Sequence, residues 1–150
     1  MKILLGRYEV NPDQLDDDGL TPLTYAASKG HERVVKVLLG QVVNPDKPDN
    51  DGQTPLSYAA RNGHEGVVEI LLGREEVNPD KPDNGGQTPL LLAAQSGHER
   101  VVKMLLGREE VNRNKPDNRG QTPLMYATSR GHKKVMELLQ PYESITHSVT

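Results

Sequence analysis

The tripeptide Thr-Pro-Leu occurs four times in the chain, and its copies begin at Thr21, Thr54, Thr88 and Thr122. Successive copies are therefore 33, 34 and 34 residues apart, and a Gly-His pair follows each copy at the same offset. A fixed period of this length is typical of proteins built from one supersecondary unit that is copied and stacked. Positions that recur in all copies are expected to maintain the scaffold, and positions that differ are the candidates for function.

The length and composition of the chain fit such a stack. Its 150 residues hold roughly four and a half units, enough for a continuous core although one unit alone would be unstable. The net charge of −3 argues against a nucleic-acid partner, and the absence of cysteine excludes disulfides and thiolate chemistry. No apolar stretch reaches the length of a membrane span, and no signal peptide is recognisable. We therefore expect an intracellular protein, cytoplasmic or nuclear, that does not contact a membrane.

The second unit indicates how each repeat is expected to fold. Thr54 suits the N-cap of a helix, and Pro55 suits its first turn, where a missing backbone N–H is harmless. Gly63 is expected to end this helix in a left-handed conformation. A second helix then begins near His64 and stops at Gly73, and the Pro-, Asn- and Gly-rich stretch after it predicts an extended loop with a tight turn. Each helix has about eight or nine residues, fewer than the roughly 12–15 that an isolated helix needs, so stacking must stabilise it.

These motifs resemble those of ankyrin repeats. The family pattern combines an Asp-x-x-Gly-x-Thr-Pro-Leu finger and helix start, an Ala-Ala-x-x-Gly-His helix end, and Val-Val and Leu-Leu pairs in the second helix. The unit from Asp49 to Leu72 carries all of them, and the resemblance extends from Met1 to about Gln140. It implies an all-α repeat solenoid, in which helix-turn-helix units stack and β-hairpin-like finger loops project. It also implies a non-enzymatic protein-protein interaction module, a scaffold that binds a partner protein through a concave surface of fingers and inner helices.

The chain departs from the family pattern in two respects. Glycine directly follows the Leu-Leu pair in the first three units, at Gly40, Gly73 and Gly107, and most connecting loops are one residue longer than usual. The Val-Asn-Pro-Asp and Lys-Pro-Asp-Asn loop style resembles long arrays in filamentous-fungus proteins, which often follow an effector or nucleotide-binding domain. The histidine that usually follows Thr-Pro-Leu, and that usually contacts the threonine, is replaced by Thr24, Ser57, Leu91 and Met125.

The period also predicts where the units begin and end. We expect an ankyrin repeat domain over residues 1–140 and a C-terminal tail over residues 141–150. Within the domain we expect a partial repeat with its finger at 1–15, repeats at 16–48, 49–82 and 83–116, and a terminal repeat at 117–140.

The two ends of the array differ in polarity. Gln140 stands where earlier units have leucine, and two lysines open the same segment, as expected of a partial cap. The N-terminal side has no such cap, because Ile3, Leu4 and Leu5 would be partly exposed there. We therefore expect either an upstream segment or weak end-to-end self-association through the uncapped N-terminal side.

No pattern in the chain indicates catalysis, a cofactor or a metal ion. The Gly-His histidines recur once per repeat, roughly 10 Å apart, whereas zinc needs nitrogen ligands near 2.0–2.1 Å from one centre. The acidic run at 16–18 lacks the spacing of a calcium loop, because Leu15 occupies a ligand position and Asp18 occupies the position of the glycine. Phosphate-binding and nucleophile motifs are absent. We expect no enzyme, no cofactor and no metal site.

The resemblance selects the candidate partner-binding residues by their position in the unit. By the resemblance, the concave surface carries the finger tips, the residue before each Thr-Pro-Leu, and the two residues before the glycine that ends each first helix. Exposed positions also vary by free drift, which is an equal alternative to selection for recognition. The candidates are Asp17, Asp18, Leu20, Ser28, Lys29, Asn50, Asp51, Gln53, Arg61, Asn62, Asn84, Gly85, Gln87, Gln95, Ser96, Asn118, Arg119, Gln121, Ser129 and Arg130.

Charge is distributed unevenly along the chain. Residues 1–75 hold 8 Lys/Arg and 12 Asp/Glu, a net charge of −4, whereas residues 76–150 hold 10 and 9, a net charge of +1. A partner of the reverse polarity would be oriented by such a field. The acidic end of the finger row is marked by Asp16, Asp17 and Asp18, and the basic end by Arg113, Lys115, Arg119 and Arg130.

The competing hypothesis is a structural spacer, or a self-associating segment of a longer ankyrin array attached to an effector or nucleotide-binding domain. It rests on the near identity of the second and third units, since a surface adapted to one partner should diversify.

At one position of the first helices, Tyr25, Tyr58 and Tyr126 interchange with Leu92, which favours a packing role there.

Overall fold

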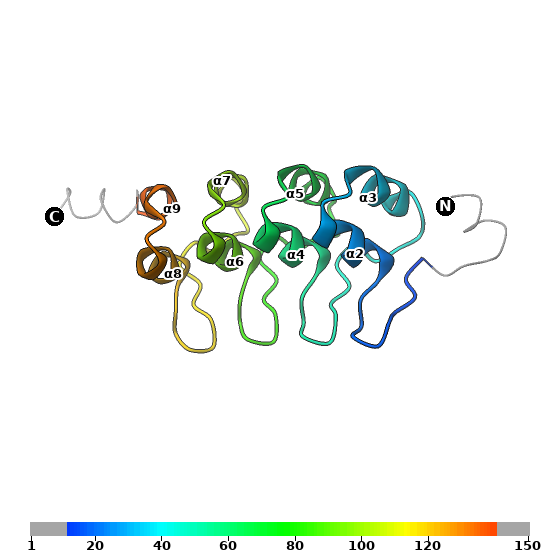
Figure 1. Cartoon of the computed structure of the whole chain (residues 1–150), viewed down its shortest axis with the longest axis horizontal. Coiled ribbons are helices and arrows are strands. Elements are labelled where there is room, and N and C mark those ends of the chain that lie inside the picture. Colours follow the sequence, from blue (N-terminus) through cyan, green and yellow to red (C-terminus); the bar gives the residue numbers. More distant parts are fainter. Residues whose placement is uncertain (1–11, 141–150) are drawn as a thin grey trace.

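Residues 12–140 are described by a computed structural model, in which they form four helix pairs and no strand. The first helices of the pairs lie in one row, the second helices lie in a second row, and the finger loops project beside the first row (Figure 1). Within residues 12–140, no helix is long and apolar enough to cross a membrane. The first helices are α2 (Pro22–Lys29), α4 (Pro55–Asn62), α6 (Pro89–Ser96) and α8 (Pro123–Arg130), and the second helices are α3 (Glu32–Leu39), α5 (Glu65–Leu72), α7 (Glu99–Leu106) and α9 (Lys133–Leu139).

The predicted helix boundaries are confirmed in each first helix. In α4, Thr54 is the N-cap and its hydroxyl accepts the backbone N–H of Ser57 at 3.2 Å, which satisfies one unpaired helix donor. Gly63 ends the helix with a φ of 74°, and its N–H is directed at the carbonyl groups of Ala59 and Ala60. A Cβ atom on Gly63 would lie 2.6 Å from the ring of His98 in the next unit, so the close contact between units also requires glycine.

The residue that replaces the family histidine divides the units into two kinds. In the first two units this residue carries a hydroxyl, and it lies 2.9 Å (Thr24) or 3.1 Å (Ser57) from the N-cap hydroxyl. In the third and fourth units it is Leu91 or Met125, whose backbone N–H alone contacts the N-cap at 3.2 Å. The N-cap is therefore retained in all four units, although the side-chain contact at the helix start is present in only two.

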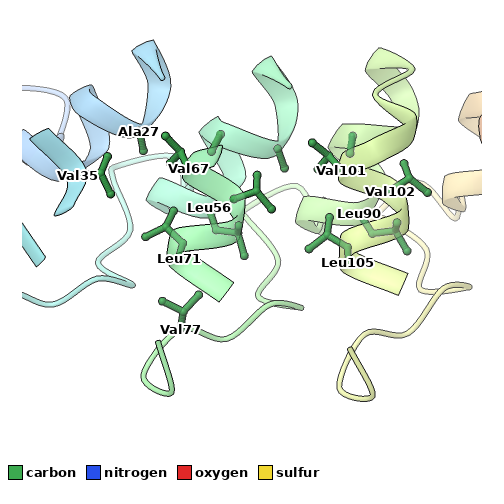
Figure 2. Packing of buried hydrophobic residues seen from close by; sticks show 14 of the residues in the cluster. Ala27, Val35, Leu56, Val67, Leu71, Val77, Leu90, Val101, Val102 and Leu105 are labelled. Carbon is green, nitrogen blue, oxygen red and sulfur yellow. The ribbon is translucent and has the colours of Figure 1, made fainter. Parts of the chain in front are cut away.

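The hydrophobic core runs through the stack between the two helix rows. Val35, Leu56, Val67, Leu90 and Leu105 are each at most 1% exposed and belong to one cluster. Side chains from successive pairs follow one another along the stack in Figure 2, so no pair has a core of its own. Burying one such Leu or Val side chain contributes about 1.5–3 kcal/mol.

The histidines of the Gly-His pairs join neighbouring units. Nε2 of His64 donates to the carbonyl oxygen of Ser28 at 2.9 Å, and Nε2 of His98 donates to that of Arg61 at 2.9 Å. His132 repeats the contact in the fourth unit, to a carbonyl oxygen at 3.1 Å. These histidines therefore act in the scaffold, each binding the end of the preceding first helix.

The connecting loops form a second set of contacts between units. Arg74 donates to the carbonyl oxygen of Leu39 at 3.0 Å, at the C-terminal end of the preceding second helix, where a cation is favourable. The backbone N–H of Asn78 donates to Oδ2 of Asp46 at 3.1 Å, and Lys81 lies 4.0 Å from the same carboxylate. Each loop is therefore bonded to the loop before it, and the helices are not the only elements that stack.

Candidate functional site

Each finger is closed by the aspartate that begins it. In the second finger the N–H of Asp49 donates to the carbonyl oxygen of Gln53 at 2.9 Å, and the N–H of Gly52 donates back to Asp49 at 3.0 Å. Oδ1 of Asp49 accepts the N–H groups of Asp51 and Gln53, both at 2.9 Å. Gly52 has a φ of 80°, a conformation that favours glycine in this turn. The same four bonds occur in the other three fingers, so all four tips share one backbone conformation.

Tyrosines of the first helices brace three of the four fingers. The hydroxyl of Tyr58 donates to Oδ2 of Asp49 at 2.5 Å, and Tyr126 makes the same bond to Asp117 at 2.6 Å. Tyr25 donates to Asp16 in the first unit. The side chains at this position therefore fix the finger of their own unit to its first helix, a polar role that their interchange with leucine did not indicate.

The third finger is held differently, because Leu92 has no hydroxyl. Leu92 is only 1% exposed, and Oδ2 of Asp83 instead accepts Nε2 of Gln53 at 3.3 Å. Gln53 belongs to the preceding finger and is itself buried. This predicted candidate for partner binding therefore contacts the next finger.

The braces favour the ionised forms of Asp16 and Asp117 and the neutral forms of the three tyrosines. The Tyr25 hydroxyl bond holds the pKa of Asp16 below its ordinary value, helped by the N–H of Leu20. Burial would raise the pKa of Asp117, but the bonds from Tyr126 and from nearby backbone N–H groups outweigh it and lower that pKa. Burial and the bond to Asp49 raise the pKa of Tyr58. The Asp16–Tyr25 and Asp117–Tyr126 pairs therefore each carry one negative charge at the base of their finger.

An asparagine at each later fingertip joins the fingers into a row. The backbone N–H of Asn50 donates to the carbonyl oxygen of Asp18 at 3.0 Å, and its side-chain amide donates to that of Asp17 at 3.1 Å. Asn84 and Asn118 make the same two bonds to the finger before them, at 2.9–3.0 Å. These three predicted candidates are exposed, yet their amide donors are used within the scaffold.

The remaining fingertip candidates present side chains to solvent. Asp17, Asp18, Asp51 and Arg119 are exposed, and Gly85 is exposed without a side chain. The residues just before Thr-Pro-Leu are less uniform: Gln121 is exposed, Leu20 and Gln87 are half-buried, and Gln53 is buried.

Among the candidates at the ends of the first helices, some are exposed and others are half-buried or bonded within the scaffold. Lys29, Ser96, Ser129 and Arg130 are exposed, and Gln95 is half-buried. The half-buried Arg61 lies over the ring of Tyr58, 5.5 Å from its centre, and the amide of Asn62 donates to the carbonyl oxygen of the half-buried Ser28 at 2.9 Å. The finger-helix surface, as we use the term, comprises the exposed side chains Asp17, Asp18, Lys29, Asp51, Ser96, Arg119, Gln121, Ser129 and Arg130.

Two basic residues that were expected at the basic end of the finger row lie elsewhere. Nη1 of Arg113 donates to the carbonyl oxygen of Leu138 on α9 at 3.4 Å, and Lys115 lies 3.9 Å from Asp80 in the preceding loop. The repeat spacing does not distinguish a residue of the connecting loop from a residue of the fingertip. Only the contacts of Arg113 and Lys115 show that they lie away from the tip. Arg119 at the tip and Arg130 on α8 remain exposed.

No group of three His, Asp or Glu side chains that could hold a metal ion occurs within residues 12–140. A hollow between α5 and α7 is lined by Glu65, Glu69, Arg100 and Lys103, among others. Arg100 and Glu65 lie 3.3 Å apart, so opposite charges already face each other there. This hollow offers less unpaired charge to a partner than the finger-helix surface does.

Comparison with protein families agrees with this architecture. The family model for ankyrin repeats, which describes three copies, matches residues 1–83 and again residues 75–148. A comparison with curated proteins gave no match. Four helix pairs, four identically closed fingers and a family match over most of the sequence lead to one conclusion: the chain belongs to the ankyrin repeat family.

Proposed function

We propose that this chain is a non-enzymatic module that binds a partner protein through its finger-helix surface. Ankyrin repeats are generally protein-protein interaction modules. The observation that supports this role here is the contrast between finger bases and finger tips. Every finger is closed by the same four hydrogen bonds, whereas the exposed tip residues Asp18, Asp51, Gly85 and Arg119 differ at one position. A uniform frame that presents different side chains is suited to recognition.

The proposal extends to the kinetics of association. Asp17 and Asp18 lie at one end of the finger row and Arg119 lies at the other, so a partner of the reverse polarity would be steered into one orientation. Reversing the charge at Arg119 and Arg130 should therefore slow association with a true partner at low salt. An unchanged association rate would contradict the steering, because steering acts mainly on that rate.

Two matched variants test where the partner binds. The first replaces Asp51, Arg119 and Arg130 by alanine on the finger-helix surface, and the second replaces Lys36, Glu69 and Lys103 by alanine on the second helices. Proteins captured from a cell lysate should be lost with the first variant and retained with the second. Loss with both variants, or with neither, would contradict a binding site on the finger-helix surface. Thermal unfolding of both variants excludes a general loss of fold.

A second candidate is a spacer or self-associating segment of a longer array, and one observation favours it. Met125 on α8 is 49% exposed, whereas Leu91 at the same position of α6 is fully buried. Apolar surface at the end of the stack would be covered by end-to-end contact. The N-terminal residues expected to take part, Ile3 to Leu5, lie outside the described residues. A mass measured over a range of concentrations decides: a constant monomer mass contradicts self-association.

Two further features belong to the proposal. We place the protein inside the cell, in the cytoplasm or nucleus, and we retain the resemblance of its loops to arrays of filamentous-fungus proteins. The repeat boundaries at 16–48, 49–82, 83–116 and 117–140 are likewise proposed. Limited proteolysis tests the boundaries, since cleavage should concentrate in exposed loops rather than in helices.

A further inference from the structure

The formal charge of the fingertips changes by one unit from each finger to the next. Each tip consists of the two residues that follow the closing aspartate: 17–18, 50–51, 84–85 and 118–119. Their formal charges are −2, −1, 0 and +1 in chain order. The charged members, Asp17, Asp18, Asp51 and Arg119, are all exposed. Along the row of fingertips, the formal charge therefore rises stepwise from negative to positive, so the row is not a single acidic patch.

The hydrogen bonds between fingers hold this gradient at a regular spacing. The second, third and fourth tips are each bonded to the preceding tip by a backbone N–H and a side-chain amide, at 2.9–3.1 Å. The two arms of a finger are also bonded to each other, as by the Asp49 N–H and the Gln53 carbonyl oxygen. Segments bonded in this way lie about 4.8 Å apart, so successive tips are separated by about 10 Å. Partner side chains would thus meet the charges at a fixed interval.

The third unit separates the acidic and basic ends of the gradient. Its tip has no charged side chain, because Gly85 stands where the neighbouring tips have Asp51 and Arg119. The end of its first helix is also neutral, with Gln95 and Ser96. At the tips a partner would therefore meet acidic, neutral and basic residues in that order, while the first-helix ends beside the first two tips carry Lys29 and Arg61.

Resting on the function proposed above, we propose that the finger row binds an extended segment of the partner protein in a single orientation. Basic residues of that segment lie over the first and second fingers, uncharged residues lie over the third, and an acidic residue lies over Arg119 of the fourth. This occupant follows from charge complementarity along the row. Arg119 suits the acidic residue because guanidinium binds carboxylate through paired hydrogen bonds.

The spacing of the tips specifies the segment further. An extended chain advances about 3.3 Å per residue, so one finger interval corresponds to about three residues. The basic residues are then about three positions apart, and the acidic residue lies about six positions beyond the second of them.

A defined peptide pair tests this inference without knowledge of the natural partner. The matched probe is a ten-residue peptide with lysine at positions 1 and 4, glutamate at position 10, and glycine or serine elsewhere. The scrambled probe has the same composition with the three charges adjacent. Each probe is titrated into the full chain at about 10 mM salt, where the Debye length is about 30 Å and charges are only weakly screened. Binding is followed by backbone amide NMR shifts. A spin label is placed at either end of the matched probe in turn.

The matched probe should bind more tightly than the scrambled probe. A label at its lysine end should broaden the amides of Asp18 and Asp51, and a label at its glutamate end should broaden that of Arg119. The double variant Asp51→Arg with Arg119→Asp exchanges two residues that occur naturally at this position and leaves the net charge unchanged. It should weaken binding of the matched probe about two- to fivefold for each pair lost. The control exchange Lys36→Glu with Glu69→Lys on the second helices should leave binding unchanged.

Equal affinity for the two probes, broadening at both ends by either label, or no shift at all would overturn the inference. Those outcomes leave the proposed function intact if proteins are still captured through the finger-helix surface. Conversely, loss of capture with both alanine variants would remove the proposed function, whatever the probes do.

Discussion

The first helices of the third and fourth units have the same residue at three matching positions, including Leu90 and Leu124, yet they are buried to different extents. All residues of α6 from Pro89 to Ala94 are buried, whereas in α8 only Pro123 and Ala127 are. The difference comes from position: α6 packs against α4 and α8, while within residues 12–140 the only first helix beside α8 is α6. At matching positions of these two helices, such as Leu90 and Leu124, burial therefore depends on the number of neighbouring units.

The largest effect is expected when the leucine at the same position of each helix is replaced by alanine. Leu90 in α6 is fully buried and Leu124 in α8 is half-buried. We expect Leu90→Ala to lower the free energy of unfolding by about 3 kcal/mol, because it leaves a cavity inside the stack. Leu124→Ala should lower it by about 1–2 kcal/mol, since part of that side chain already contacts solvent. Urea unfolding measures both, and equal losses would contradict the dependence on position.

The histidines allow a smaller test of the same kind. His98 donates to the carbonyl oxygen of Arg61, whereas His31 is exposed and has no side-chain hydrogen bond to any residue from 12 to 140. His98→Ala should lower the free energy of unfolding by about 1–2 kcal/mol, because it leaves a carbonyl group without its partner. His31→Ala should change it by less than about 0.5 kcal/mol. A large loss from His31→Ala would show that this histidine also joins units.

Removing the tyrosine braces tests whether an interior finger is better protected than a terminal one. Tyr58→Phe and Tyr126→Phe each remove one hydrogen bond to a finger aspartate, and each should lower the free energy of unfolding by about 1 kcal/mol. The local effects should differ, because the second finger is bonded to fingers on both sides and the fourth is bonded only to the third within residues 12–140. Hydrogen exchange of the Gly120 amide should accelerate more in Tyr126→Phe than that of Gly52 in Tyr58→Phe. Equal acceleration would show that neighbouring fingers add no protection.

The smallest expected effect concerns the carboxylates of the connecting loops. Burial raises the pKa of Asp46 above its ordinary value of 3.8, and the Asn78 N–H and Lys81 offset only part of this. The folded protein thus binds this proton more tightly than the unfolded chain, so the group's contribution to stability falls as pH rises from about 4 towards neutrality. Asp46→Asn keeps an oxygen for the Asn78 N–H and should raise the free energy of unfolding at neutral pH by less than about 1 kcal/mol. The third unit already has Asn114 at this position.

The opposite sign is expected for Asp117, whose pKa is lowered in the folded protein. Its ionised form stabilises the fold above the unfolded pKa, and that stability is lost as pH falls. Asp117→Asn should therefore destabilise the protein at neutral pH and flatten its acid dependence. Unfolding free energies of both asparagine variants across the acid range check the two signs, and the same sign for both would contradict the pKa directions.

Much of the fold could be predicted from the sequence, because local signals repeat four times. Thr54, Pro55 and Gly63 predicted the start and end of a first helix, and the structure confirms these positions. The loop and its tight turn followed from Asn, Pro and Gly residues whose backbone preferences are local. Such signals act within a few residues of the chain, so they can be read without the rest of the molecule.

The candidate surface was predictable only in part. The exposure of Asp18 and Arg119 agrees with their choice as fingertip candidates. The use of the Asn50 amide, the burial of Gln53 and the position of Lys115 did not follow from spacing, because each depends on a contact with a neighbouring unit. One signal was available: asparagine recurs at 50, 84 and 118, and a recurring residue indicates a scaffold role.

The sequence by itself determined the unit: its period, its two short helices, its caps and the residue types offered at each tip. These properties arise from backbone preferences and hydrogen bonds within one repeat. The tertiary structure decided how the units join, which polar side chains are used between them, and therefore which of the varying residues remain exposed. That division has a physical reason: helices of eight residues gain their stability from neighbours, so contacts between units govern the surface that a partner meets.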